Sequence, residues 1–247
     1  MPTTGIPKLD NVLMEGIPEG FSILVVGTPG SGTELFAKQF AGAATKGENV
    51  IYFTTTESTE EIKATMKSYG WRDDIEVVSI ATEYYEKVLS KELEASRLKK
   101  EGLSISDIAK LTVGEAREEV NFLETLTYEL SKRKGKYRVA VDSLDFFLEH
   151  YPSEDVISAL RTIETHIHYT KGVAMFTLAK DVYDKRIENA IAAIIDCLIE
   201  LEVVKVGIGF ENRLVIKKVK NQPQKMATLI YSITEKGITP EVITRIG

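Results

Sequence analysis

The most informative segment of the sequence is Gly27-Thr28-Pro29-Gly30-Ser31-Gly32-Thr33-Glu34. It follows the apolar run at residues 21–26 and precedes a segment in which Leu35, Phe36 and Phe40 have helical spacing. A strand, a glycine-rich turn and a helix N-terminus in this order are typical of a phosphate-binding loop. Backbone N–H groups of the turn and the dipole of the helix both favour an anion there. The sequence therefore predicts a phosphate-binding backbone at residues 27–34.

This loop lacks the two side chains that phosphate chemistry uses. The usual pattern is G-x-x-x-x-G-K-[ST], in which the Lys reaches the terminal phosphates and the hydroxyl binds Mg²⁺. Thr33 stands at the Lys position and Glu34 at the hydroxyl position. The lost charge-assisted hydrogen bond is worth about 1.5–3 kcal/mol. A carboxylate about 4 Å from a phosphate costs on the order of 4 kcal/mol at an effective dielectric constant of about 20. We therefore predict a loop that keeps its shape and binds nucleotide weakly or not at all.

The composition is that of an ordinary globular protein, with 247 residues, a net charge of −6 and one cysteine, Cys197. This length predicts a single domain over residues 1–247, with a helical insertion at about 83–114 where the strand–helix alternation is interrupted. The acidic balance argues against a protein-wide nucleic-acid footprint. A lone cysteine fits a reducing compartment, and no apolar run approaches the roughly 20 residues of a membrane span. We expect a cytoplasmic protein without a membrane partner.

Strand and helix patterns alternate through most of the chain and then give way to strands. Expected strands lie at residues 21–26, 49–54, 75–80, 137–141, 172–178, 194–204, 211–219 and 226–233. Expected helices lie at about 33–45, 58–69, 84–100, 104–110, 115–133 and 152–169. This order predicts an α/β protein with a mainly parallel, doubly wound sheet, helices on both faces and a C-terminal antiparallel extension.

Polar residues follow two of the expected strands. In an α/β sheet, ligands bind beyond the carboxyl ends of the strands. The strand at 49–54 leads into Thr55-Thr56-Glu57, and the strand at 137–141 ends at Asp142. An apolar strand ending in Asp is typical of a Walker B site, where the carboxylate holds Mg²⁺ through water. Asp142 is therefore the candidate metal residue, with capping of local amides as the structural alternative.

Several motifs together resemble the KaiC/RadA branch of the RecA-like ATPases. They are TGIPKLDNVLMEGIPEG before the loop, YFTTTES, VDSL, AIIDCLIEL, IKKVKNQ and YSITEKGI, in the order in which that family carries them. The resemblance covers nearly the whole chain except the region at 83–114. It implies a RecA-like P-loop NTPase fold, ATP and Mg²⁺ as ligands, and active sites that lie between protomers of an oligomer.

The resemblance also assigns roles to positions where this chain departs from the family. The family places two acidic residues after the second strand, and the first activates water. Thr56 occupies that first position, and only Glu57 remains. The basic pair that reaches a neighbour's phosphate corresponds to Lys218 and Lys220. The loop Lys, the loop hydroxyl and the first acid are all lost, whereas Asp142 is kept. Joint loss of interdependent parts indicates abandonment of the reaction, so we expect no catalytic residue.

The leading interpretation is a pseudoenzyme with a degenerate Walker A motif, acting as a regulatory or structural subunit that requires neither ATP nor Mg²⁺. Such a protomer could still supply Lys218 and Lys220 to an active neighbour. We therefore expect a homo-oligomer or a hetero-oligomer with an active paralogue.

Two alternatives remain open. One is a weak ATP-binding protein or ATPase with a relocated Lys, for which Lys38 is the candidate; the plainer interpretation is that Lys38 pairs with Glu34 at the surface. The other is a DNA-associated recombinase-paralogue accessory protein, because residues 97–112 resemble half of a helix-turn-helix. The acidic residues that follow, such as Glu118, disfavour DNA. We favour a lid-like or partner-binding insertion there.

His166 and His168 would point about 200° apart on a helix, which disfavours a metal site between them.

Overall fold

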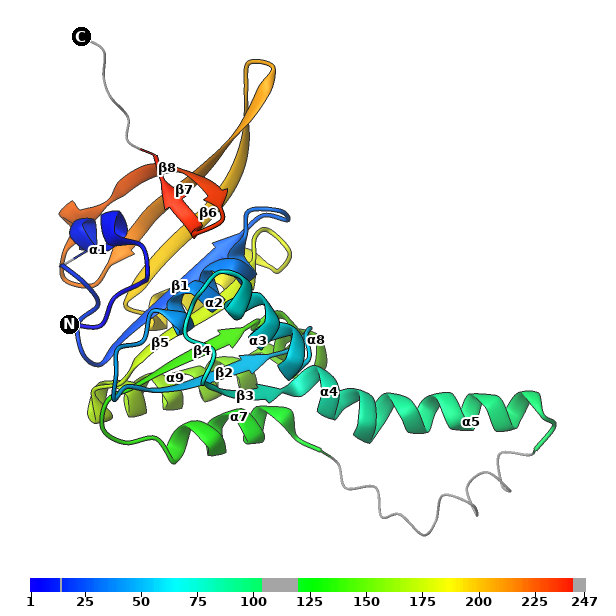
Figure 1. Cartoon of the computed structure of the whole chain (residues 1–247). Coiled ribbons are helices and arrows are strands. Elements are labelled where there is room, and N and C mark those ends of the chain that lie inside the picture. The colour runs from blue at the N-terminus through cyan, green and yellow to red at the C-terminus, as the bar shows by residue number, and fades with distance from the viewer. Residues whose placement is uncertain (14, 104–119, 242–247) are drawn as a thin grey trace.

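A computed structural model describes residues 1–13, 15–103 and 120–241, and a nine-stranded sheet runs through it (Figure 1). The strands are β1 (Phe21–Gly27), β2 (Asn49–Thr54), β3 (Glu76–Ser79), β4 (Tyr137–Asp142), β5 (Val173–Ala179), β6 (Cys197–Val206), β7 (Gly209–Val219), β8 (Ala227–Thr234) and β9 (Gly237–Pro240). Their order in the sheet is β3-β2-β4-β5-β1-β6-β7-β8-β9. Strands from β3 to β6 pair in parallel, and β6 to β9 pair antiparallel. The predicted fold class is confirmed.

Helices cover both faces of the parallel part of the sheet (Figure 1). The α-helices are α1 (Pro7–Leu13), α2 (Thr33–Gly42), α3 (Thr59–Ser68), α4 (Ile80–Tyr84), α5 (Ser90–Lys100), α7 (Phe122–Ser131), α8 (Asp145–His150), α9 (Ser153–Thr170) and α10 (Lys185–Ile194). A π-helical turn, η1 (Tyr85–Leu89), joins α4 to α5, and a 3₁₀ turn, η2 (Pro223–Lys225), precedes β8. No helix in the described part of the chain is long and apolar enough to cross a membrane.

Strand β1 is buried along its whole length because its alternate side chains enter two different cores. Ile23 and Val25 belong to the core under α2 and α3, whereas Leu24 and Val26 belong to the core under α7 and α9. A strand buried on both faces reads as a continuous apolar run, which is the pattern of residues 21–26. The glycine-rich loop follows β1 and therefore lies at the carboxyl end of a central strand of the sheet.

Helices α2 and α7 differ in extent from the sequence-based expectation. Helix α2 ends at Gly42 rather than near residue 45, because the chain turns into a loop in which Glu48 accepts hydrogen bonds from Thr45. Helix α7 begins at Phe122 rather than near residue 115, since the Asn121 side chain caps it at 3.1 Å from the amides of residues 123 and 124. The expected helix at 104–110 and residues 115–119 lie outside the described residues.

Helix α10 was not expected, because the apolar residues near 194 resemble the start of a strand. The Asp184 side chain caps this helix by accepting a hydrogen bond from the Arg186 amide at 2.7 Å. Ile187 and Ile191, one turn apart, pack into the core under α9. The expected strand at 194–204 therefore begins only at Cys197.

The segment from α4 through α5 extends away from the sheet as one helical arm (Figure 1). Its outer part, α5, buries no residue. The described portion of the expected insertion at 83–114 is therefore helical, and the remainder, from residue 104, lies outside the described residues.

A buried ion pair ties β4 to the turn before β2. Arg138 is fully buried, and its Nε and Nη2 donate to the two carboxylate oxygens of Glu48 at 2.8 and 2.9 Å. The guanidinium also donates to the carbonyls of Thr3 and Phe40, so its charge is hydrogen-bonded as well as paired. Burial of this kind is tolerated only when the charge is compensated.

We expect Arg138→Met to lower the free energy of unfolding by about 3–5 kcal/mol, because it leaves the Glu48 carboxylate buried without its cation. The double variant Glu48→Met with Arg138→Met removes both charges and should be less destabilised than the single variant. Urea unfolding followed by circular dichroism measures these differences. The matched control is Arg161→Met at an exposed arginine of α9, with an expected change within about 0.5 kcal/mol. Equal losses in the two arginine variants would contradict this prediction.

Candidate functional site

The glycine-rich loop connects the carboxyl end of β1 to the first turn of α2. Gly30 and Gly32 have φ angles of +80° and +82°, a left-handed conformation that other residues rarely adopt. The hydroxyl oxygens of Ser31 and Thr33 lie 3.2 Å from each other and pack against Gly27. A side chain at Gly27 would collide with both of them. The predicted strand–loop–helix frame is therefore present, and two of its own hydroxyls pack against its first glycine.

Lys38, on the next turn of α2, directs its ammonium toward the end of β2. Its side chain is only 3% exposed, and Nζ lies 2.5 Å from Glu57 Oε2. Glu57 is held in place because its amide donates to Thr54 Oγ1 at 3.0 Å and its carbonyl accepts from Ser79 Oγ at 2.8 Å. The suggested surface pair between Glu34 and Lys38 is thus wrong in this structure, since Lys38 turns inward and pairs across to the neighbouring strand end.

A cavity of about 370 Å³ opens beside this ion pair. It is lined by Gly30, Gly32, Glu34, Leu35, Lys38, Glu57, Thr65, Tyr69 and Ile233. The lining thus combines the predicted phosphate-binding loop with the acid that follows β2. Thr56, at the position where the family has its water-activating acid, is exposed and is not part of this lining.

Asp142 lies at the carboxyl end of β4 and is 6% exposed. Its Oδ2 accepts a hydrogen bond from the Tyr52 hydroxyl and its Oδ1 accepts one from Thr177 Oγ1, both at 2.8 Å. Burial raises the pKa of the Asp142 carboxyl, and the charge of Lys38 opposes that rise. Each oxygen of the candidate metal residue therefore already has a partner inside the protein.

The backbone at this edge suits a phosphate, whereas the side chains do not fit ATP with Mg²⁺. The loop backbone and the N-terminus of α2 suit an anion. Glu34, in the first turn of α2, offers a carboxylate where the family offers a hydroxyl and adds negative charge beside the phosphate position. The ammonium of Lys38 is engaged by Glu57. The side chains therefore do not reproduce the metal and phosphate contacts that the fold family implies.

Lys218 and Lys220 lie toward the opposite end of the sheet. Lys218 pairs with Leu198 in the sheet, and its Nζ donates to the carbonyls of Ala192 and Ile195 at 2.8 and 2.6 Å. Lys220 Nζ lies 2.6 Å from Asp196 Oδ1. Asp196 is hydrogen-bonded to Ser22 at the start of β1. At the usual rise per residue, Ser22 and Gly27 are about 16 Å apart along this strand. The two lysines are therefore remote from the loop of their own chain.

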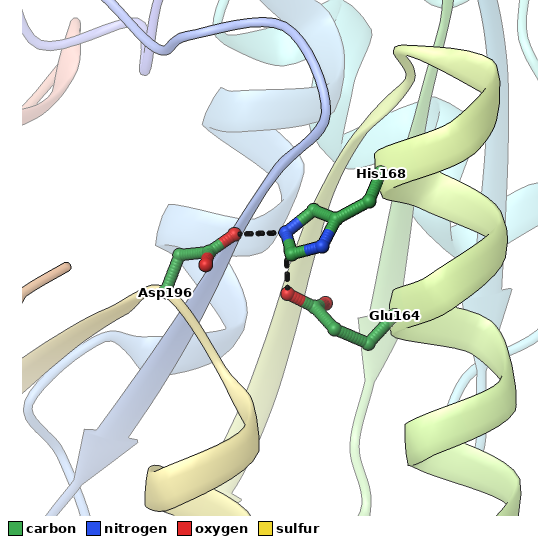
Figure 2. A group of neighbouring side chains, drawn as sticks. All are labelled: Glu164, His168 and Asp196. Carbon is green, nitrogen blue, oxygen red and sulfur yellow. Dashed lines mark hydrogen bonds and ion pairs between the residues drawn. The ribbon is translucent and has the colours of Figure 1, made fainter.

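A cluster that sequence reasoning missed surrounds Asp196 (Figure 2). His168 Nε2 lies 2.8 Å from Asp196 Oδ2 and 3.1 Å from Glu164 Oε1. Burial raises the pKa of Glu164 to about 8. His166 points elsewhere and contacts the Arg133 carbonyl at 3.2 Å, so the expected divergence of the two histidines is confirmed. The available signal was the spacing of Glu164 and His168, one helical turn apart, rather than the H-x-H pair.

Comparisons with known proteins agree with this geometry. The family described as "ATPase: KaiC" matches residues 2–242. A UPF0273 protein of Thermotoga maritima is 25% identical, and the match covers 95% of this chain and 93% of that protein. A UPF0273 protein of Aeropyrum pernix is 26% identical, and the match covers 99% of this chain and 95% of that protein. The circadian clock protein KaiC3 of Synechocystis is 36% identical over 69 residues, 28% of this chain and 14% of that protein.

Among solved structures, a KaiC-like protein from the archaeon Pyrococcus horikoshii superimposes with a TM-score of 0.65. The match has 20% sequence identity and covers 97% of this chain and 98% of that chain. At this identity the likeness establishes the fold alone. The expected RecA-like P-loop fold is confirmed.

The electrostatic effect of the Lys38 ammonium can be measured as a change in the pKa of Asp142. We expect Lys38→Met to raise the pKa of Asp142 further, because burial then acts without the opposing ammonium. A carboxyl whose folded pKa is raised stabilises the fold at low pH and loses that contribution as the pH rises through the folded pKa. In Lys38→Met this loss therefore continues to higher pH than in the wild type.

Carboxyl ¹³C chemical shifts followed against pH measure the pKa directly, and urea unfolding at several pH values measures the linked stability. The matched control is Lys67→Met, an exposed lysine of α3, which should leave Asp142 unchanged. An Asp142 pKa that is the same in Lys38→Met and Lys67→Met would show that the Lys38 ammonium does not act on this carboxyl.

Proposed function

The chain belongs to the KaiC family of ATPases, and we propose that it is a member whose ATPase centre no longer turns over ATP. In this proposal the protein is a regulatory or structural subunit that binds nucleotide weakly or not at all. Family membership is the premise, and the loss of turnover is inferred from the side chains at the carboxyl edge of the sheet.

The observation that carries the proposal is the ion pair between Lys38 and Glu57. Glu57 is the acid that remains after β2, and its carboxylate is held 2.5 Å from an ammonium instead of facing a water molecule that it could activate. The same contact engages the cation that lies beside the loop. One interaction therefore removes both a base and a phosphate ligand from the centre.

Glu34 and Asp142 support the same conclusion. Glu34 places negative charge beside the phosphate position, where an anion needs donors. Asp142 has its two oxygens bonded to Tyr52 and Thr177, and burial favours its neutral form. A metal ion would have to displace these partners to reach the carboxyl oxygens.

One specific feature favours a second candidate, a weak ATP-binding protein or ATPase with a relocated Lys. Lys38 lines the same cavity as Gly30 and Gly32, so its ammonium lies near the predicted phosphate position. In that candidate Lys38 exchanges Glu57 for a phosphate oxygen. The exchange leaves Glu57 without its cation, which is why we rank this candidate second.

Assembly into an oligomer is part of the proposal. Lys218 and Lys220 lie far from the loop of their own chain, so a phosphate that they contact would belong to a neighbour. The tip of the β6–β7 hairpin also exposes three apolar side chains, with Val206, Ile208 and Phe210 at 49%, 106% and 76% exposure. Neighbouring exposed apolar side chains of this kind are typical of protein contact surfaces.

Titration calorimetry with ATP and Mg²⁺ tests the nucleotide site. We expect the double variant Thr33→Lys with Glu34→Thr to bind ATP at least tenfold more tightly than the wild type, since it restores the missing cation and removes a repelling carboxylate. The matched control is Glu60→Thr, which removes an exposed carboxylate from the first turn of α3 and should leave the affinity unchanged.

Tight ATP binding by the wild type, unchanged in the double variant, would overturn the proposal. The second candidate would gain support if that binding were lost in Lys38→Met and kept in Lys67→Met.

A further inference from the structure

Glu164, His168 and Asp196 converge at the amino end of β1, opposite the glycine-rich loop (Figure 2). Glu164 and His168 are one turn apart on α9, and Asp196 directly precedes β6. Each residue offers one ligand atom, and these atoms all lie within 4.8 Å of one another. We propose that this cluster is a binding site for a divalent transition-metal ion of the Zn²⁺ type.

The spacing of the ligand atoms suits such an ion. His168 Nε2 lies 2.8 Å from Asp196 Oδ2 and 3.1 Å from Glu164 Oε1. Bonds of about 2.0–2.2 Å in a tetrahedral site place neighbouring ligand atoms about 3.3–3.6 Å apart. Contact with one ion therefore requires the two histidine contacts to open by about 0.2–0.8 Å. The two carboxylate oxygens already lie within 4.8 Å of each other. One imidazole with two carboxylates is a ligand set that Zn²⁺ and its neighbours in the first row accept, whereas Mg²⁺ and Ca²⁺ prefer oxygen alone.

A second observation is independent of this spacing. Glu164 is 6% exposed and points into the cluster, yet its Oε2 is buried without a hydrogen-bond partner among the described residues. Leaving a buried carboxylate oxygen unpaired costs free energy. A bound cation would satisfy this oxygen.

Ser22 fixes the orientation of the two carboxylates. Its amide donates to Asp196 Oδ2 at 3.2 Å, and its hydroxyl donates to Glu164 Oε1 at 2.9 Å. Partners of this kind, behind the ligands, hold metal-binding side chains in position and raise affinity. The His168 side chain is 39% exposed, so an ion can enter from solvent and keep water in its remaining positions.

Lys220 competes with the ion for Asp196. Its Nζ lies 2.6 Å from Asp196 Oδ1 and 3.5 Å from His168 Nε2, so it supplies positive charge to the cluster. The Lys220 side chain is 47% exposed and flexible, and it can turn into solvent when an ion binds. Removing its charge should therefore strengthen metal binding, an effect opposite in sign to the loss of a ligand.

The test is a Zn²⁺ titration of the tag-free, full-length protein against a chromogenic chelator. We expect one ion per chain, and His168→Ala should lower the affinity at least tenfold. The matched control is His166→Ala, on the same helix and bonded to the Arg133 carbonyl instead, which should bind as the wild type does. Lys220→Met should bind more tightly than the wild type.

Two further measurements keep the test decisive if His168→Ala does not fold. Glu164→Gln preserves the size of that side chain and should also weaken Zn²⁺ binding. Co²⁺ added to the wild type should give a visible absorption band that His166→Ala retains and Glu164→Gln changes. The proposal is overturned if the wild type binds no stoichiometric Zn²⁺, or if binding falls equally in the His166 and His168 variants. In either case the cluster is a hydrogen-bond network that joins α9 to β1 and β6.

Discussion

The buried ammonium of Lys38 is the interaction on which the carboxyl edge of the sheet depends. A lysine whose side chain is 3% exposed is stable only with a partner, and Glu57 provides it. Lys38 also opposes the rise in the Asp142 pKa that burial causes, whereas Glu34 adds to that rise. One cation therefore moderates the charge of several carboxylates that the fold brings to this edge. In a working ATPase of this architecture, the metal ion and the loop lysine would share that role.

The sequence predicted the parts of this edge that follow from strand order alone. Parallel strands meet at one edge of the sheet, so the loop after β1, Glu57 after β2 and Asp142 at the end of β4 were expected to lie together, and they do. The partner of Lys38 could not be predicted in the same way. Helical spacing places Lys38 one turn from Glu34, but only the packed structure decides that its side chain faces the core and reaches Glu57.

Interactions between distant parts of the chain account for the rest of what the sequence did not predict. The His168–Asp196 contact needs the start of β6 to lie beside the start of β1, a neighbourhood that the local pattern does not contain. Arg138 follows a group of basic residues at 132–136, and that pattern is typical of a solvated surface. Arg138 is nevertheless fully buried, because Glu48 compensates its charge. Helix α10 was not predicted, and its last residue was assigned to the following strand because isoleucines suit both elements. The capping Asp184 was the signal for the helix.

Strand β1 links two chemically different ends of the molecule, with the glycine-rich loop after its last residue and the Glu164–His168–Asp196 cluster beside its second. Lys220 belongs to the second end, and the family resemblance also assigns it to contact with a neighbouring protomer. ATP turnover is inferred to be lost at the first end. A single-turnover experiment with radiolabelled ATP and Mg²⁺ at an excess of protein measures this loss. We predict no labelled phosphate above that of a protein-free blank. Release of about one phosphate per bound ATP, abolished by Asp142→Ala, would contradict it.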